Sequence, residues 1–303
     1  IIPPHDNGIS SCIEEISSTA VWEMWTEDAE ANINPIPESV IENYLLEVQS
    51  LRIHTDDNWQ SGAKLVYTPL HGVGTYWVME SLRRAKHDVT IVKEQETPDG
   101  DFPTVAFPNP EEPGALDLAI ELAKEIGADA VLANDPDADR VAIAIPNERG
   151  VFTKLTGDQV GLLLAHYLLE FGYWGDKPMV ATTIVSSSLL ADLAFTYNCA
   201  YEETLTGFKW IANKAIEHDQ RNGGSFVIGF EEALGYSIGK VARDKDGVSA
   251  ILIAADMLSF AKNNGNTLWD LLIELYKKLG LSLSTQKSIK KPGSSGAEEI
   301  ATM

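Results

Sequence analysis

Cysteine, basic residues and long apolar runs are all scarce in this chain of 303 residues. The two cysteines, Cys12 and Cys199, are too few for a disulfide framework, which predicts a reducing compartment and hence a cytoplasmic protein. No apolar run reaches the length needed to cross a bilayer. The 23 Lys and Arg against 45 Asp and Glu give a formal charge of −22 without an evident basic face, so we expect neither nucleic acid nor a membrane as a partner.

The most informative segment is Asn134-Asp-Pro-Asp-Ala-Asp-Arg140, in which three aspartates alternate with other residues directly before an arginine. Short apolar runs at 130–133 and 141–145 flank it, which predicts two strands joined by a tight acidic loop. Crowded carboxylates repel one another unless a cation lies among them, and Mg²⁺ with oxygen ligands fits best. Arg140 would offer a planar fork to a phosphate oxygen. A solvated acidic turn is the alternative on spacing alone.

A calcium-binding hand is excluded at this segment. Such a loop needs glycine at its sixth position and a bidentate glutamate at its twelfth. Counted from Asp135, these positions hold Arg140 and Pro146. Proline has no side-chain ligand, and no helical pattern precedes the loop.

The order of apolar patterns predicts an α/β fold of two tandem domains, with mixed sheets flanked by helices. Helices are expected near 10–25 and from Pro37 onward, and strands then alternate with helices from 64 to 145 and again after 151. A proline-rich stretch at 95–113 is too long for a routine connector, so we expect it to be functional or disordered. The strands are expected at 64–67, 88–92, 130–133, 141–145, 179–185, 200–203 and 225–230, and the later helices at 73–85, 115–126, 156–171, 188–198, 207–218, 248–262 and 268–279.

Ligands of open α/β sheets collect beyond the carboxyl ends of the strands, where further loops carry polar groups. The loop 68–74 leads two glycines into a helix and suits an anion, or is a plain turn whose His71 packs locally. The loop 204–210 offers a hydroxyl, a glycine, an aromatic residue and a lysine, a set that suits a sugar, although Phe208 and Trp210 are equally consistent with a core.

Two charged segments complete the set of candidate loops. Adjacent glutamates in Phe230-Glu-Glu-Ala-Leu-Gly-Tyr236 directly follow an apolar strand, and a carboxylate there would orient a sugar ring through its hydroxyls. Arg243-Asp-Lys-Asp-Gly247 presents a lysine that would contact phosphate or transfer a proton. A solvated hairpin is the alternative for this last segment.

The segments 134–140, 206–209, 229–236 and 243–247 resemble, in sequence and in order, the motifs of the α-D-phosphohexomutases, which are the phosphoglucomutases and phosphomannomutases. The sequence of 201–210 is most similar to that of the phosphopentomutase-like phosphoglucomutases, one branch of the family. The resemblance runs through nearly the whole chain and implies the two central domains of a four-domain protein. It places the end of the first domain and a connecting helix at 1–36, the second domain at 37–149, the third at 150–283, and a linker with the start of the fourth at 284–303.

The resemblance also implies a metal site and two catalytic residues. Asp135, Asp137 and Asp139 would hold Mg²⁺, whose remaining ligand in the parent protein is a phosphoserine oxygen. Arg140 would contact the substrate or a sugar bisphosphate, and Lys245 would face phosphate or act in proton transfer.

Substrate binding is implied for three further residues. Thr206 and Gly207 would line the sugar pocket, and Glu231 would accept hydrogen bonds from sugar hydroxyls. The chain has Ala233 where most of the family has serine, so the preference between hexose and pentose phosphates stays open.

The activity that the resemblance implies is intramolecular phosphotransfer between positions 1 and 6 of a hexose phosphate, or 1 and 5 of a pentose phosphate. The substrates would be glucose, mannose or pentose phosphates, with a sugar bisphosphate as intermediate. Neither the family's phosphoserine loop nor its distal phosphate-binding loop occurs in the sequence. We therefore expect a central fragment of a longer protein that binds Mg²⁺ weakly and has no mutase turnover of its own.

Two alternatives remain from the residues alone. An aspartate-nucleophile phosphatase also has an Asp-x-Asp pattern after a strand. A non-catalytic module that binds sugar phosphates would use the same loops without a reaction.

Overall fold

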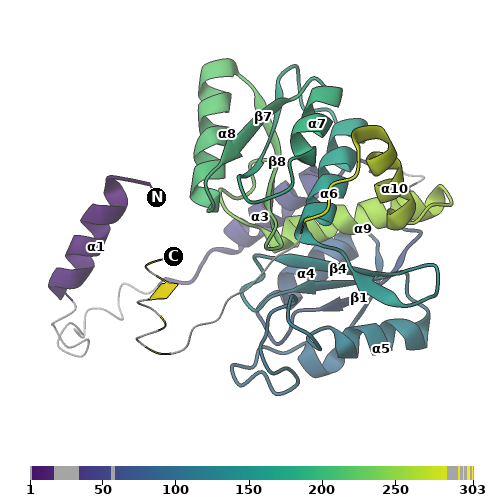
Figure 1. The fold of residues 1–303 in the computed structure, drawn as a ribbon. Helices are drawn as coiled ribbons and strands as arrows, with labels where there is room; N and C mark the ends of the chain where they lie inside the picture. Colours follow the sequence, from purple (N-terminus) through teal and green to yellow (C-terminus); the bar gives the residue numbers. More distant parts are fainter. Residues whose placement is uncertain are drawn as a thin grey trace.

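The computed structural model describes residues 2–16, 34–55 and 59–284, together with isolated positions between 293 and 302 (Figure 1). Within these residues, no helix combines the length and apolar character that crossing a membrane would require. The helices are α1 (His5–Ile16), α3 (Glu38–Ser50), α4 (Thr75–Arg84), the short η2 (Lys93–Gln95), α5 (Asp117–Ile126), α6 (Gly157–Phe171), α7 (Leu189–Thr196), α8 (Phe208–Asn222), α9 (Gly247–Asn263) and α10 (Leu268–Leu279). The strands are β1 (Lys64–Thr68), β2 (Asp88–Ile91), β3 (Ala130–Asn134), β4 (Val141–Pro146), β5 (Phe152–Lys154), β6 (Pro178–Thr183), β7 (Ala200–Thr204), β8 (Ser225–Glu231) and β9 (Gly235–Ile238).

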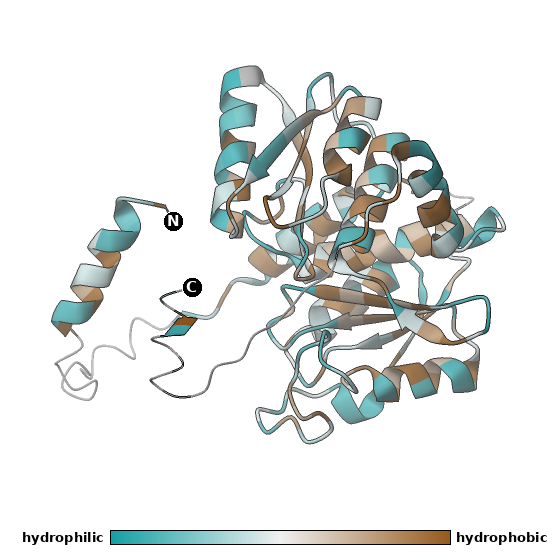
Figure 2. Ribbon diagram, viewed as in Figure 1, coloured by the Kyte–Doolittle hydropathy of each residue, from teal (hydrophilic) through white to brown (hydrophobic). Residues whose placement is uncertain are grey.

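The strands form two mixed sheets, which confirms the predicted fold class. The first sheet has the order β2-β1-β3-β4-β5, in which β2, β1 and β3 are parallel while β4 and β5 are antiparallel to their neighbours. The second has the order β7-β6-β8-β9, and only β9 is antiparallel. In Figure 2 the central strands of the first sheet are mainly hydrophobic, whereas α8 is mainly hydrophilic.

Helix α9 lies between the two sheets and contacts both. Its residues from Gly247 to Ser259 are all buried, and most of them are apolar. A helix of this kind must be covered all round, and α9 packs against α3, α4, β3 and β4 of one half and against α6 and β9 of the other. The buried apolar residues of both halves consequently form one continuous cluster.

The amino end of α9 is held in place by Asp246. Its carboxylate accepts a hydrogen bond from the Val248 N–H (3.1 Å), which caps the helix, and another from the Tyr44 hydroxyl (2.9 Å) on α3. The capping box predicted at the start of α6 is also present, because the side chains of Thr156 and Gln159 bond each other's backbone N–H groups.

Two short strands differ from the sequence prediction. β5 follows the domain boundary predicted near 150 but pairs with β4 in the first sheet, and β9 occupies a segment expected to be a loop and pairs with β8. They have three and four residues, too few for a periodic pattern to reveal. The division between 149 and 150 stays a prediction. Of the helix expected over 10–25, only α1 is described, since 17–33 lie outside the described residues, as does most of the predicted linker 284–303.

A buried polar network joins α9 to the elements that precede β1 and β2. The carboxylate of Asp256, fully buried, accepts two hydrogen bonds from the Arg52 guanidinium (2.9 and 3.0 Å). The His87 ring lies 2.8 Å from the same carboxylate and 3.0 Å from the Ser61 hydroxyl. These groups provide one another's hydrogen bonds in the absence of water, so the loss of one leaves its partners buried without a hydrogen bond.

We therefore predict that Asp256→Ala lowers the free energy of unfolding by about 3 kcal/mol, because it leaves the Arg52 charge buried and unpaired. Urea unfolding followed by circular dichroism measures the change. The matched control is Asp219→Ala, which removes an exposed ion pair with Lys240 (2.8 Å) and should cost less than about 1 kcal/mol. Equal losses in the two variants would contradict the role assigned to the buried network.

Candidate functional site

The acidic loop is the tight turn between β3 and β4, whose register pairs Asn134 with Val141. The Asn134 side chain closes the turn from below, since its Nδ2 donates to the Arg140 carbonyl (2.6 Å) and its Oδ1 accepts from the Tyr67 hydroxyl (2.9 Å). Ala138 has a φ of 60°, in the left-handed region that reverses the chain. The loop thus has a defined shape before any ligand binds.

Two neighbouring elements brace this loop. The Val73 N–H, before α4, donates to the Pro136 carbonyl (2.8 Å), and the Gly247 N–H, at the start of α9, donates to the Ala138 carbonyl (3.1 Å). A Cβ atom at Gly247 would lie 2.5 Å from that carbonyl oxygen, so only glycine allows the approach. The acidic loop is therefore fixed to the central helix.

The side chains of the three aspartates converge. One carboxylate oxygen from each of Asp135, Asp137 and Asp139 lies within 4.8 Å of the other two. Asp135 is buried and Asp137 exposed. Partial desolvation and then the charges of Asp135 and Asp139 raise the pKa of Asp137 above its ordinary value. Three converging carboxylates, one of them destabilised as an anion, fit a hard divalent cation such as Mg²⁺.

Two cations already lie against this cluster. The backbone N–H and Nε of Arg140 donate to the two oxygens of Asp135 (3.0 and 2.5 Å), and the Lys245 ammonium lies 3.0 Å from Asp139. Partial burial alone would lower the pKa of Lys245, but the bonds with Asp139 and Asp244 outweigh it and raise that pKa. In this arrangement Lys245 is a fixed positive charge, which suits a phosphate contact better than proton abstraction.

Glu111 is a site residue that sequence reasoning missed. It lies in the proline-rich stretch, and its carboxylate is 3.6 Å from the Arg140 guanidinium. The Lys154 ammonium donates to the carbonyls of Pro110 and Glu111 (2.9 Å each) and so fixes this end of the stretch. Glu111, Lys154, Asp158 and Glu232 border a cavity of about 380 Å³. The only sequence signal was the unusual length of the stretch.

Glu231 ends strand β8, and a tight turn joins it to β9. Its carboxylate accepts a hydrogen bond from the Gly207 N–H (2.6 Å), so two of the predicted sugar-binding residues are in direct contact. Burial raises the pKa of the Glu231 carboxyl, against the opposing effect of the Gly207 N–H. Thr206 lies next to them and is exposed.

Ser186, in the turn after β6, supports the same hairpin. Its hydroxyl accepts from the Glu232 N–H and donates to the Glu232 carboxylate (3.1 Å each). The three consecutive serines at 186–188 do not indicate this contact along the chain.

The remaining candidate loop, 68–74, has a supporting place. His71 is buried, and its Nε2 lies 2.8 Å from the Thr104 hydroxyl of the proline-rich stretch. The loop therefore lies between the acidic loop, through Val73, and the stretch that carries Glu111.

The predicted motifs thus meet in one region where the two sheets adjoin. An isolated bridge between Arg140 and Gly235 joins the acidic loop to the β8–β9 hairpin. Lys245 contacts Asp139 and is close enough to Glu231 to act on its charge.

Two domain models of one protein family match this chain. Residues 42–150 match the model of phosphoglucomutase/phosphomannomutase alpha/beta/alpha domain II, and residues 156–279 match that of domain III. The chain belongs to this phosphohexomutase family. The predicted order of a second and a third family domain agrees with the order of the two matches.

Two curated members of the family align with nearly all of the chain. A probable phosphoribomutase of Schizosaccharomyces pombe is 38% identical over 299 residues, which are 95% of this chain and 50% of the relative. A probable phosphomannomutase of Haemophilus influenzae is 39% identical over 294 residues, which are 96% of this chain and 57% of the relative. The chain thus spans about half the length of these relatives.

Solved phosphohexomutases share the fold. A phosphoglucomutase/phosphomannomutase family protein from Burkholderia thailandensis is 18% identical with a TM-score of 0.62, and the match covers 82% of this chain and 48% of that one. An N-acetylphosphoglucosamine mutase from Aspergillus fumigatus, solved with GlcNAc-6P and magnesium, is 16% identical with a TM-score of 0.52, over 77% of this chain and 51% of that one. At these identities the similarity concerns the fold.

The charge arrangement at the three aspartates predicts opposite effects for two similar substitutions in metal-free protein. Asp137→Asn should raise the free energy of unfolding at neutral pH, because it removes an anion whose pKa is raised in the folded state. Asp135→Asn should lower it by about 1–2 kcal/mol, because it weakens the bonds with Arg140.

Urea unfolding in the presence of EDTA tests both effects. A raised folded-state pKa means that Asp137 takes up a proton as the pH falls through that pKa and its penalty disappears, so the gain from Asp137→Asn should vanish toward about pH 4. A loss of stability in Asp137→Asn at neutral pH would contradict the electrostatic account.

Proposed function

We propose that this chain forms the metal-binding and sugar-binding part of a phosphosugar mutase. The observation that carries the proposal is the position of Lys245, which links Asp139 of the acidic loop to the region of Glu231. A cation site for a phosphoryl group thus adjoins a carboxylate suited to sugar hydroxyls. The names of the two relatives, a phosphoribomutase and a phosphomannomutase, support the same substrate class.

Asp135, Asp137 and Asp139 would hold Mg²⁺, as the magnesium in the Aspergillus fumigatus relative suggests by analogy. Bound there, the ion would neutralise charge on the phosphoryl group that is transferred. Arg140 and Lys245 add two fixed positive charges beside it, and both are held in place by carboxylates before a substrate arrives. Such preorganised charge is the main contribution that a protein makes to phosphoryl transfer.

Glu231, with Gly207 and Thr206 beside it, would orient the sugar. The Glu231 carboxylate uses one oxygen for the Gly207 N–H, which leaves its other oxygen for a sugar hydroxyl. The reaction would exchange the phosphoryl group between positions 1 and 6 of a hexose, or 1 and 5 of a pentose. It would pass through a sugar bisphosphate that stays bound while it reorients in the site.

The phosphoserine that exchanges the phosphoryl group would lie in the part of the relatives that this chain does not match. We therefore propose that the chain alone binds Mg²⁺ and phosphosugar without turnover. A phosphatase with Asp135 as nucleophile is less well supported, because both oxygens of Asp135 accept hydrogen bonds from Arg140.

We predict that the chain binds Mn²⁺, a probe for Mg²⁺, and that Asp139→Asn weakens this binding at least tenfold. Titration followed by the electron paramagnetic resonance of free Mn²⁺ measures the affinity. The matched control is Asp244→Asn, since Asp244 also contacts Lys245 (3.4 Å) but is not one of the three converging aspartates. Equal affinities in wild type and Asp139→Asn would contradict the metal site.

We further predict that Glu231→Gln weakens binding of glucose 6-phosphate and ribose 5-phosphate about tenfold, because glutamine retains an acceptor for Gly207 but loses the charge that strengthens bonds from sugar hydroxyls. Isothermal titration calorimetry measures both ligands, and Glu232→Gln is the control. If neither phosphosugar binds to the wild-type chain in the presence of Mg²⁺, the proposed function is wrong. Adding the domains of a relative that this chain does not match distinguishes a mutase from a non-catalytic binding module, because only a mutase would then isomerise the sugar phosphate.

A further inference from the structure

Phe208 lies where the sugar-binding turn and Lys245 meet. It directly follows Gly207, begins α8 and is 4% exposed. The Lys245 ammonium lies 5.5 Å from the centre of its ring. A cation within about 6 Å of an aromatic ring is attracted by the negative face of the ring.

Gly235 makes this contact possible. A Cβ atom there would lie 2.6 Å from Cδ of Lys245 and 2.8 Å from Cε2 of Phe208, so the lysine stem and the ring both pack onto a bare backbone. Gly235 is also the residue of β9 that pairs with Glu231 and bridges to Arg140. The ring, the lysine and the hairpin are therefore assembled around one glycine.

Besides its neighbour Asp244 (3.4 Å), the Lys245 ammonium has two partners, and they come from different halves of the molecule. Asp139 belongs to the acidic loop of the first sheet, at 3.0 Å, and Phe208 to the first turn of α8 on the second sheet. If Asp139 turned toward a bound cation, the ring would still hold the ammonium beside Glu231. An aliphatic side chain of similar size would fill the space but would not attract the charge.

We propose that Phe208 is a positioning residue that holds Lys245 for the phosphosugar. Because Gly207, the residue before it, donates to Glu231, the placement of the ring also sets the distance between the lysine and the sugar-binding carboxylate. The consequence for phosphosugar affinity rests on the proposed function, whereas the contact between ring and lysine does not.

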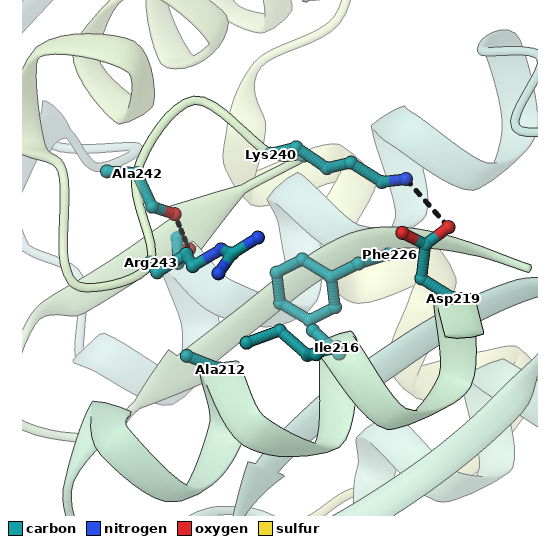
Figure 3. A pocket seen from close by; sticks show the side chains of 10 residues that line it. Ala212, Ile216, Asp219, Phe226, Lys240, Ala242 and Arg243 are labelled. Atoms are coloured by element: carbon teal, nitrogen blue, oxygen red, sulfur yellow. Dashed lines mark hydrogen bonds and ion pairs between the residues drawn. The ribbon is translucent and has the colours of Figure 1, made fainter. Parts of the chain in front are cut away.

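Phe226 offers a matched control. It is also 4% exposed and belongs to the same small apolar cluster as Phe208, with Met179, Ala181 and Ile211. Figure 3 shows its ring beside Ile216, at a cavity of about 70 Å³ that Lys240 and Arg243 border. Phe208→Leu and Phe226→Leu therefore each remove one phenyl ring from the same cluster, but only Phe208→Leu removes a ring that contacts Lys245.

The contact has a spectroscopic signature. Reductive methylation with carbon-13 labels the lysines as cationic dimethylamines, and Lys245→Arg identifies the signal of Lys245. The ring face should shift this signal upfield in the wild type, in Phe208→Tyr and in Phe226→Leu. Phe208→Leu should return it to the position of an exposed lysine.

Phosphosugar binding gives the functional result. Phe208→Leu should weaken binding of ribose 5-phosphate or glucose 6-phosphate about fivefold, Phe208→Tyr should restore it, and Phe226→Leu should leave it near the wild-type value.

An unshifted Lys245 signal in the wild type, or equal effects of the two leucine variants on signal and affinity, would overturn the proposal. A shifted signal that Phe208→Leu removes, in a chain that binds neither phosphosugar, would instead refute the proposed function and leave the contact between ring and lysine established.

Discussion

The burial of α9 between two sheets is the constraint on which the rest of the structure depends. Because the helix is mostly apolar and buried on every side, neither sheet alone can cover it. Its burial fixes its amino end, where Asp246 caps the helix and accepts a hydrogen bond from the Tyr44 hydroxyl, and where the Gly247 N–H donates to the acidic loop. Lys245 immediately precedes these residues, so the packing of the helix also determines where this charge lies. Stability and the geometry of the site are thus set by the same element.

The charges of the three aspartates, Arg140 and Lys245 explain why the site suits a cation and a phosphate. The chain carries a formal charge of −22, and three of its carboxylates converge within 4.8 Å. Arg140 and Lys245 offset two of them, while the pKa of Asp137 stays raised. The remaining negative charge favours a metal ion, and the two side-chain cations are already placed for the phosphate that the ion would accompany.

Periodicity was a good guide to the fold wherever an element was long enough to show it. The strands around the acidic loop, the alternation of strands and helices, and the capping box at Thr156 all follow from local patterns, and the structure confirms them. β5 and β9 were missed because strands of three and four residues exist through their pairing partners rather than through their own pattern. The close association of the two halves also escaped prediction, since an apolar helix does not show which surfaces will cover it.

Patterns among residues close together in the chain were enough to predict the family, the mixed α/β fold and the local order of the acidic loop. Which distant groups act together became apparent only from the folded structure. Glu111 reaches Arg140, Ser186 holds Glu232, and Phe208 lies against Lys245. These contacts join residues 29 to 46 positions apart, a separation at which no pattern along the chain specifies a distance in space. They arise because the two sheets pack over one buried helix, which brings together the loops that follow the carboxyl ends of their strands.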